Sequence, residues 1–246
     1  MSRELAGPWL APANDTFDGR AYYAAKTASD GRQRFCFGWL PTRTDERDDG
    51  AWNWGDQVVV HQLTQEPDGH LSVRMPQTVA QAFGPAVPLQ AESAFGPWRV
   101  EDDVITGGDV GQASVLLLGD LPTTYLVEAE CTIGAGTASA GLLLRADGAL
   151  DHYYALCLEP GAQRIVWDRW PRPGDQAFMI ERPLAIGASE PVRLRLLVDG
   201  TCVVAYADEK VALSCRMYDH PAGEVGLFVH EGQAQFRQVS VRVRRP

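Results

Sequence analysis

Short runs of apolar and β-branched residues alternate with Gly, Pro, Asp and Asn along nearly the whole chain, and apolar positions at helical spacing are almost absent. Such runs predict β-strands, because successive side chains of a strand face opposite sides of a sheet. The pattern predicts strands at residues 34–40, 57–63, 71–74, 125–133, 140–145, 153–158, 164–168, 192–198, 202–207, 224–229 and 235–243. An all-β fold follows, with helix limited to a turn or two near residues 77–83.

A change of composition divides the chain into three parts. Residues 1–83 form a short block rich in tryptophan and in turn residues. Residues 84–98 contain three prolines and no convincing strand, which indicates a linker that lies along a surface. Residues 99–246 carry a longer series of alternating strands, typical of a sandwich of two antiparallel sheets.

Composition narrows the class of partner. The chain has 246 residues, of which 45% are hydrophobic, so it can bury a sizeable core and is not expected to be disordered. The formal net charge of −10 argues against nucleic acid or an anionic membrane as a partner. A neutral polymer such as a sugar is compatible with this charge.

The five cysteines are widely spaced and include no Cys-x-x-Cys pair; they are Cys36, Cys131, Cys157, Cys202 and Cys215. Spacing for zinc or redox chemistry is therefore absent, and we expect neither a metal nor a cofactor. Most of the cysteines lie in apolar runs, which predicts buried free thiols in a reducing compartment. Neither a signal peptide nor a membrane-spanning run is visible. These features predict a cytoplasmic protein, although a truncated start would also lose a signal.

The most informative motif begins at residue 18. It reads Asp18-Gly-Arg-Ala-Tyr-Tyr-Ala-Ala-Lys-Thr27 and is followed by Phe37-Gly-Trp39. This order resembles the "D-x-G-x-x-F-Y-A-x-x-T … G-W" signature of family 32 glycoside hydrolases, the β-fructosidases that act on sucrose or fructans. The family order continues in Trp54-Gly-Asp-Gln-Val-Val-Val-His-Gln-Leu63 and Asp68-Gly-His-Leu71. The resemblance implies that residues 1–83 are the last part of a five-bladed β-propeller.

The second half of the chain resembles the C-terminal module of the same family, through Leu194-Arg-Leu-Leu-Val-Asp-Gly200 and Gly223-Glu-Val-Gly-Leu-Phe228. The resemblance implies a concanavalin-like antiparallel β-sandwich. Three positions depart from the family pattern. Val204 stands where the family often carries Glu, Tyr206 replaces a Phe, and His61 lies where Pro-Arg is common. Because His61 lies on an apolar strand, a hydrogen-bonded core or interface histidine is favoured over a catalytic one.

The carboxylates that the family uses for catalysis are not found in this sequence. Family members cleave fructosyl linkages with retention, through a carboxylate nucleophile and a carboxylic acid/base. No Asn-Asp-Pro-Asn-Gly, Arg-Asp-Pro or Glu-Cys-Pro motif is present, and Glu130-Cys131 lies in an alternating strand run, with Glu130 on the solvent face. We therefore expect no catalytic residues and an inactive C-terminal half of a fructosidase. Such a half is expected to form an oligomer or to bind a complementary propeller chain.

The resemblance also implies sugar contacts in the first block. It points to Asp18, Tyr23 and Trp39 as borders of a fructose pocket, with weaker indications for Arg20 and Lys26. An aromatic face would stack on the sugar ring, and a carboxylate would accept hydrogen bonds from its hydroxyls. Two alternatives stay open: Trp39 is a core residue of a blade, and Asp18 begins a turn with the following glycine.

Tryptophans elsewhere offer further candidate platforms. Trp52 and Trp54 flank Asn53 in a loop, where packing against the sandwich is favoured over sugar binding. In the sandwich itself, Trp167 and Trp170 are candidate sugar contacts, and an interface with the propeller is the alternative. These residues keep a second function open, that of a non-catalytic carbohydrate-binding or structural β-sandwich protein.

Overall fold

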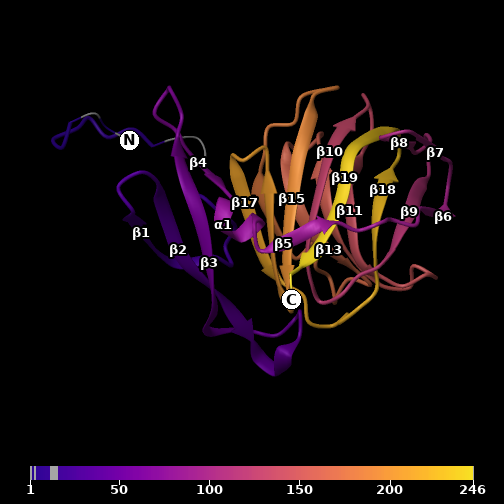
Figure 1. The fold of residues 1–246 in the computed structure, drawn as a ribbon, viewed down its shortest axis with the longest axis horizontal. Helices are drawn as coiled ribbons and strands as arrows, with labels where there is room; N and C mark the ends of the chain where they lie inside the picture. Colours follow the sequence, from indigo (N-terminus) through magenta and orange to yellow (C-terminus); the bar gives the residue numbers. More distant parts are fainter. Residues whose placement is uncertain (1, 3, 12–15, 246) are drawn as a thin grey trace.

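The computed structural model describes residues 2, 4–11 and 16–245, which form three antiparallel β-sheets (Figure 1). Two of the sheets form a sandwich, and a smaller sheet packs against one side of it (Figure 1). The expected all-β fold with an antiparallel sandwich is confirmed.

The small sheet has four strands in the order β1-β2-β3-β4. They are β1 (Tyr23–Ser29), β2 (Arg34–Arg43), β3 (Trp52–Gln65) and β4 (Leu71–Arg74). Tight turns join β1 to β2 and β3 to β4, and each contains an Asp-Gly pair. Gly31 and Gly69 in these turns have a φ of 91°, a conformation that glycine adopts without steric cost. A 3-10 turn, η1 (Thr44–Glu46), lies in the longer connection from β2 to β3.

The first sandwich sheet has eight strands, in the order β17-β16-β15-β10-β19-β8-β7 with β5 also paired to β19. Its strands are β17 (Val211–Arg216), β16 (Cys202–Ala207), β15 (Pro191–Asp199), β10 (Thr124–Ile133), β19 (Ala234–Arg244), β8 (Val104–Gly107), β7 (Trp98–Glu101) and β5 (Phe83–Ala86). The second sandwich sheet has seven strands, in the order β14-β13-β12-β11-β18-β9-β6. Its strands are β14 (Ile180–Pro183), β13 (Arg164–Trp170), β12 (Tyr153–Glu159), β11 (Ser139–Ala146), β18 (Glu224–His230), β9 (Ala113–Asp120) and β6 (Glu92–Phe95).

Every strand that the sequence predicts is present, and the predicted helical turn is α1 (Gln77–Ala80). The expectation of no strand within residues 84–98 is wrong. The strand β6 lies inside this segment and pairs with β9, and β5 overlaps its start and pairs with β19. The segment therefore adds short strands to both sandwich sheets. The prolines of this segment disfavour strands, so the sequence does not predict them. Pairing with a neighbouring strand outweighs this local preference.

The two sandwich sheets enclose the main apolar core. Leu126 on β10, Leu142 on β11, Leu156 on β12 and Phe236 on β19 are completely buried there. Alternation along the strands produces this core, since every second residue of β15 is buried and the residues between them are more exposed. Each such side chain contributes about 1.5–3 kcal/mol of transfer free energy when it leaves water.

The small sheet uses one face to extend this core. Cys36, Leu40 and Val59 on its inner face belong to the same buried apolar cluster as the sandwich residues. The neighbouring positions Phe37 and Val58 point to the outer face and are 41% and 61% exposed. The small sheet therefore has one buried face and one solvent-facing face with apolar side chains on it.

Residues just before the small sheet cover the free edge of the first sandwich sheet. The backbone N–H of Ala212 on β17 donates to the carbonyl of Phe17 at 3.2 Å. Nearby, the N–H of Val73 on β4 donates to the carbonyl of Lys210 at 3.1 Å. Covered edges leave fewer unpaired backbone groups to attract another chain.

Among the described residues, no helix has the length and apolar character needed to cross a membrane.

Candidate functional site

A buried polar network joins the small sheet to the sandwich. Asp18 and His61 have fully buried side chains, and Asp18 Oδ2 lies 3.0 Å from His61 Nε2. Asp18 Oδ1 accepts hydrogen bonds from the backbone N–H of Ser214 at 2.7 Å and of Gly19 at 2.6 Å, and Oδ2 accepts a short one from the Ser214 hydroxyl. On the other side of the histidine ring, Nδ1 lies 2.9 Å from the Tyr206 hydroxyl. Asp18 and His61 thereby tie β3, β16 and β17 together.

This geometry corrects the expected sugar contact of Asp18. Its carboxylate has no access to solvent, and both of its oxygens are already occupied by protein donors. The alternative of a turn with Gly19 fits better, because the N–H of Tyr22 donates to the Gly19 carbonyl at 3.1 Å. Asp18 therefore stabilises the interface, and the expectation that His61 is a hydrogen-bonded interface histidine is confirmed.

A second network anchors the connection between β2 and β3 to the sandwich. Asp48 is 2% exposed, and its Oδ2 accepts hydrogen bonds from the Tyr154 hydroxyl at 2.5 Å and from Arg169 Nη1 at 3.1 Å. Its Oδ1 accepts from the backbone N–H of Tyr218 at 2.8 Å. Asp219 contacts the same arginine and accepts from the N–H of Asp48 at 3.1 Å. Both carboxylates of this network contact the single Arg169 guanidinium, which fits a structural role.

Burial shifts the pKa of two tyrosine hydroxyls in these networks and of a neighbouring histidine. It raises the pKa of the Tyr206 and Tyr154 hydroxyls well above the ordinary value, so both stay protonated at neutral pH. The ring of His220 stacks on His152 with centroids 4.4 Å apart, and burial and the charge of His152 lower the pKa of His220. Within the described part of the chain, no three His, Cys, Asp or Glu side chains gather to hold a metal ion.

An open pocket of about 640 Å³ lies on the outer side of the small sheet; we call it the aromatic pocket. Its main walls are Tyr23 of β1, Trp39 of β2 and Trp54 of β3. The centroid of the Trp39 ring lies 5.1 Å from that of Tyr23 and 6.4 Å from that of Trp54. Trp54 is 82% exposed and Tyr23 is 59% exposed, so both rings present a free face to solvent.

Strand register explains why these rings meet. Tyr23 and Trp39 are direct cross-strand partners, so their side chains share one face of the sheet. Gly55 lies under the indole of Trp39, where a Cβ would come within 2.3 Å of the ring. At the far side of the pocket, the Arg43 guanidinium lies 3.9 Å from the centroid of the Trp52 ring and holds it in place.

The structure brings together two of the three expected pocket residues. Tyr23 and Trp39 both line the aromatic pocket, and Arg20 lines it while donating to the Met179 carbonyl at 2.9 Å. The weaker candidate Lys26 is not among the lining residues. The expectation that Trp54 packs against the sandwich is wrong, because its ring stands on the opposite, solvent-facing side of the small sheet.

The described side chains of the aromatic pocket are suited to stacking and hydrogen bonding. Its described lining consists of the four aromatic side chains with Arg20, Ala21, Pro41 and Asn53, and it includes no carboxylate. A retaining glycosidase needs two carboxyl groups about 5–5.5 Å apart. These residues can stack on a sugar ring and exchange hydrogen bonds with its hydroxyls. They cannot supply a nucleophile together with an acid/base.

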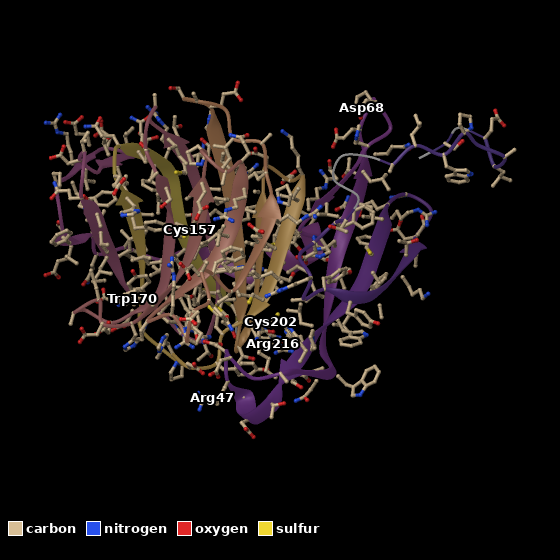
Figure 2. All side chains as sticks on the ribbon, turned by 180° about the vertical axis from the view of Figure 1, so that it is seen from behind. Arg47, Asp68, Cys157, Trp170, Cys202 and Arg216 are labelled. Atoms are coloured by element: carbon tan, nitrogen blue, oxygen red, sulfur yellow. The ribbon has the colours of Figure 1, made fainter. Side chains whose placement is uncertain are left out.

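The two candidate tryptophans of the sandwich differ completely in position. Trp167 is 1% exposed, and its Nε1 donates to the Leu213 carbonyl at 3.1 Å in the core. The expected sugar contact of Trp167 is therefore corrected to a core role. Trp170, three residues later on the same strand, is 48% exposed. Figure 2 shows Trp170 on the part of the sandwich away from the small sheet, whereas Arg216 lies beside that sheet.

Comparison with protein families identifies the sandwich. A model described as "Glycosyl hydrolases family 32 C terminal" matches residues 102–243, which is more than half of the chain. The chain belongs to this family. The recognition of family 32 from the sequence motifs is thereby confirmed, and a comparison with curated protein sequences gives no match.

Solved structures extend the likeness of this family 32 chain beyond the sandwich. A fructosyltransferase from A. japonicus is 18% identical with a TM-score of 0.64, and 92% of this chain covers 44% of that protein. An exo-inulinase from Aspergillus awamori is 12% identical with a TM-score of 0.64 and the same coverages. The carbohydrate binding module CBM66 from Bacillus subtilis is 17% identical with a TM-score of 0.55, and 62% of this chain covers 94% of that module. The family 32 chain thus spans less than half the length of the two enzymes and nearly the whole module.

Two departures from the family pattern meet in the interface of this family 32 chain. His61 and Tyr206 are far apart in sequence, yet the histidine Nδ1 lies 2.9 Å from the tyrosine hydroxyl. A phenylalanine in place of Tyr206 would leave Nδ1 without this partner. Tyr206 therefore completes the hydrogen bonds of His61, whose other ring nitrogen contacts Asp18.

Proposed function

We propose that this family 32 chain recognises carbohydrate without cleaving it, and that the aromatic pocket is a sugar site. The observation that carries the proposal is the cluster of Tyr23, Trp39 and Trp54 around an open hollow whose described lining has no carboxylate. Aromatic rings held by strand pairing offer a rigid stacking surface for the apolar face of a sugar. Arg20 and Asn53 supply hydrogen-bonding groups at the same hollow.

The proposed sugar is a fructan or sucrose. The similarity to a fructosyltransferase and an exo-inulinase supports a fructosyl ligand, and the similarity to a carbohydrate binding module supports binding without cleavage.

The small sheet is proposed to be one blade of a β-propeller, with residues 1–83 as the propeller part, 84–98 as the connection and 99–246 as the sandwich. Its four antiparallel strands and its exposed outer face support this assignment. Phe37 and Val58 on that face are apolar and solvent-facing, as expected for a blade that packs against a neighbour. The proposed partner is a complementary propeller chain or a second copy of this chain, bound along the exposed edge strand β1 so that the aromatic pocket stays open.

Sugar binding at the aromatic pocket is tested by replacing its most exposed ring. We expect Trp54→Ala to weaken binding of an inulin-type fructo-oligosaccharide by about tenfold, because one stacking face is lost. Isothermal titration calorimetry on the full chain measures the change. Trp9→Ala is the matched control, since Trp9 is 67% exposed and lies outside the pocket lining. Equal affinity in the wild type, Trp54→Ala and Trp9→Ala would refute the proposed site.

The same purified chain is expected to release no fructose from sucrose or inulin. The aromatic pocket lacks a carboxylate pair among its described residues, so no group is positioned to form and then hydrolyse a fructosyl intermediate. A coupled assay for free fructose over a day checks this. Release that scales with the concentration of pure protein, and that persists across independent preparations, contradicts the non-catalytic part of the proposal.

A further inference from the structure

A second hollow lies on the outer face of the second sandwich sheet, on the side opposite the core. It has a volume of about 350 Å³ and is lined by residues of β9, β11, β12, β13 and β18; we call it the sandwich hollow. These are five adjacent strands of one sheet, so the sandwich hollow extends across about 19 Å, or four spacings of about 4.8 Å. None of its lining residues belongs to the aromatic pocket.

Small residues in the central strands create the hollow. Cross-strand partners form a row across the sheet, from Ala155 through Leu143 to Gly226. Asp168, the partner of Ala155 on β13, lies at the outer end of this row. In the next row, Gly141 has no room for a side chain, because a Cβ would lie 2.0 Å from the Leu156 carbonyl oxygen. Phe228, the cross-strand partner of Gly141, lies against this glycine and forms one wall of the hollow. The floor is apolar and already packed, as Leu143 and Ala155 are 2% and 4% exposed.

One end of the sandwich hollow combines an aromatic platform with polar groups. Trp170 and Tyr153 are cross-strand partners there, and 48% of Trp170 is exposed. Arg172 contacts Asp168 Oδ2 through Nε at 3.0 Å and through Nη2 at 2.5 Å. An ion pair of this kind offers acceptors and donors side by side, which matches the hydroxyl groups of a sugar. The indole offers the stacking face beside them.

The charges around the hollow indicate an uncharged ligand. Asp168 is paired with Arg172, and Arg164 contacts both Glu159 and Glu181 at 2.5 Å. An acidic or basic ligand would have to disrupt these pairs to find a counter-charge. A neutral polyhydroxylated ligand can bind to the pairs as they stand, since its hydroxyl groups both donate and accept.

We propose that the sandwich hollow is a second carbohydrate site, which takes a linear neutral oligosaccharide. Trp170 stacks on a sugar ring, Tyr153 and the Asp168–Arg172 pair contact its hydroxyls, and the hollow across the central strands accommodates the next units of the chain. The proposal goes beyond the aromatic pocket and stands on different residues, so either site can fail without the other.

The test uses two linear probes, the inulin-type oligosaccharide kestopentaose and the glucan cellohexaose, with the full chain. The indole N–H signals of the seven tryptophans are followed by nuclear magnetic resonance during titration, and those of Trp170 and Trp54 are assigned by their loss in Trp170→Ala and Trp54→Ala. We expect at least one probe to shift the Trp170 signal, in the wild type and in Trp54→Ala alike. Both Trp170 variants lose this signal, so their affinity is measured by isothermal titration calorimetry in the Trp54→Ala background, where Trp170→Ala is expected to weaken binding by about tenfold and Trp170→Phe by about threefold or less.

Two further variants separate binding from folding. Asp168→Asn removes the charge of the pair at the surface of the hollow and is expected to weaken binding about tenfold without loss of the folded spectrum. Trp9→Ala again serves as the control and is expected to change neither event. A Trp170 signal that stays unmoved by both probes overturns the sandwich site, whereas an unmoved Trp54 signal overturns only the aromatic pocket. If the Trp170 signal of Asp168→Asn shifts with the same affinity as that of the wild type, the proposed contact of Asp168 with the sugar is wrong.

Discussion

Replacing Asp18 by alanine is expected to lower the free energy of unfolding by about 3–5 kcal/mol. The change removes the acceptor of four hydrogen-bond donors, from His61, Gly19 and Ser214, in a place without solvent. Each buried donor that loses its partner costs about 1–3 kcal/mol, and neighbours in one network do not add simply. Urea unfolding followed by circular dichroism and by tryptophan fluorescence measures the loss.

Two further variants test whether the loss in Asp18→Ala comes from its buried hydrogen bonds. Asp18→Asn keeps the shape and one acceptor oxygen, so it is expected to lose less than the alanine variant. Asp103→Ala removes an exposed aspartate of a turn and is expected to change stability by no more than about 0.5 kcal/mol. If Asp18→Ala unfolds at the same urea concentration as Asp103→Ala, the interface network does not stabilise the fold as described.

The second large effect concerns a pair of tryptophans on β13. Trp167→Ala is expected to cost about 3–5 kcal/mol, because it opens a cavity in the core and leaves the Leu213 carbonyl without its donor. Trp170→Ala, on the same strand and half exposed, is expected to cost less than about 1 kcal/mol. The midpoints of thermal unfolding for the two variants give the comparison directly.

Trp167→Phe provides the check on mechanism for this pair. The smaller ring retains much of the buried area while the hydrogen bond to Leu213 is lost, so its stability should fall between the wild type and Trp167→Ala. Similar losses for Trp167→Ala and Trp170→Ala would contradict the assignment of one residue to the core and the other to the surface.

The sequence predicted the fold well where side-chain alternation was strong. The alternating run of residues 192–198, for example, is part of β15, and its inward positions are buried. It predicted the family from short motifs around Asp18 and Trp39. The strand β9 was missed, although Val115 and Leu117 on it are buried on one face and Leu116 and Leu118 on the other. Burial on both faces removes the alternation that marks a strand.

The roles of single residues were harder to predict, because they depend on strand register. Trp167 and Trp170 look equivalent in the sequence, yet an odd spacing of three places them on opposite faces of β13. Asp18 reads as a sugar ligand until β17 is placed beside it. Trp54 was assigned to an interface because the sequence cannot reveal that Gly55 and Trp39 set its ring on the outer face.

The cysteines give this protein a set of internal reporters of local opening. All five are free and buried, with Cys36 in the small sheet, Cys157 in the second sandwich sheet and the other three in the first. Burial raises the pKa of Cys202 and Cys215 to about 12, so thiolate is scarce in the closed state. An alkylating reagent can therefore label each thiol only when its own region opens. Mass spectrometry of the labelling over time would rank the three sheets by how often each one opens locally. No cysteine has to be introduced for this measurement.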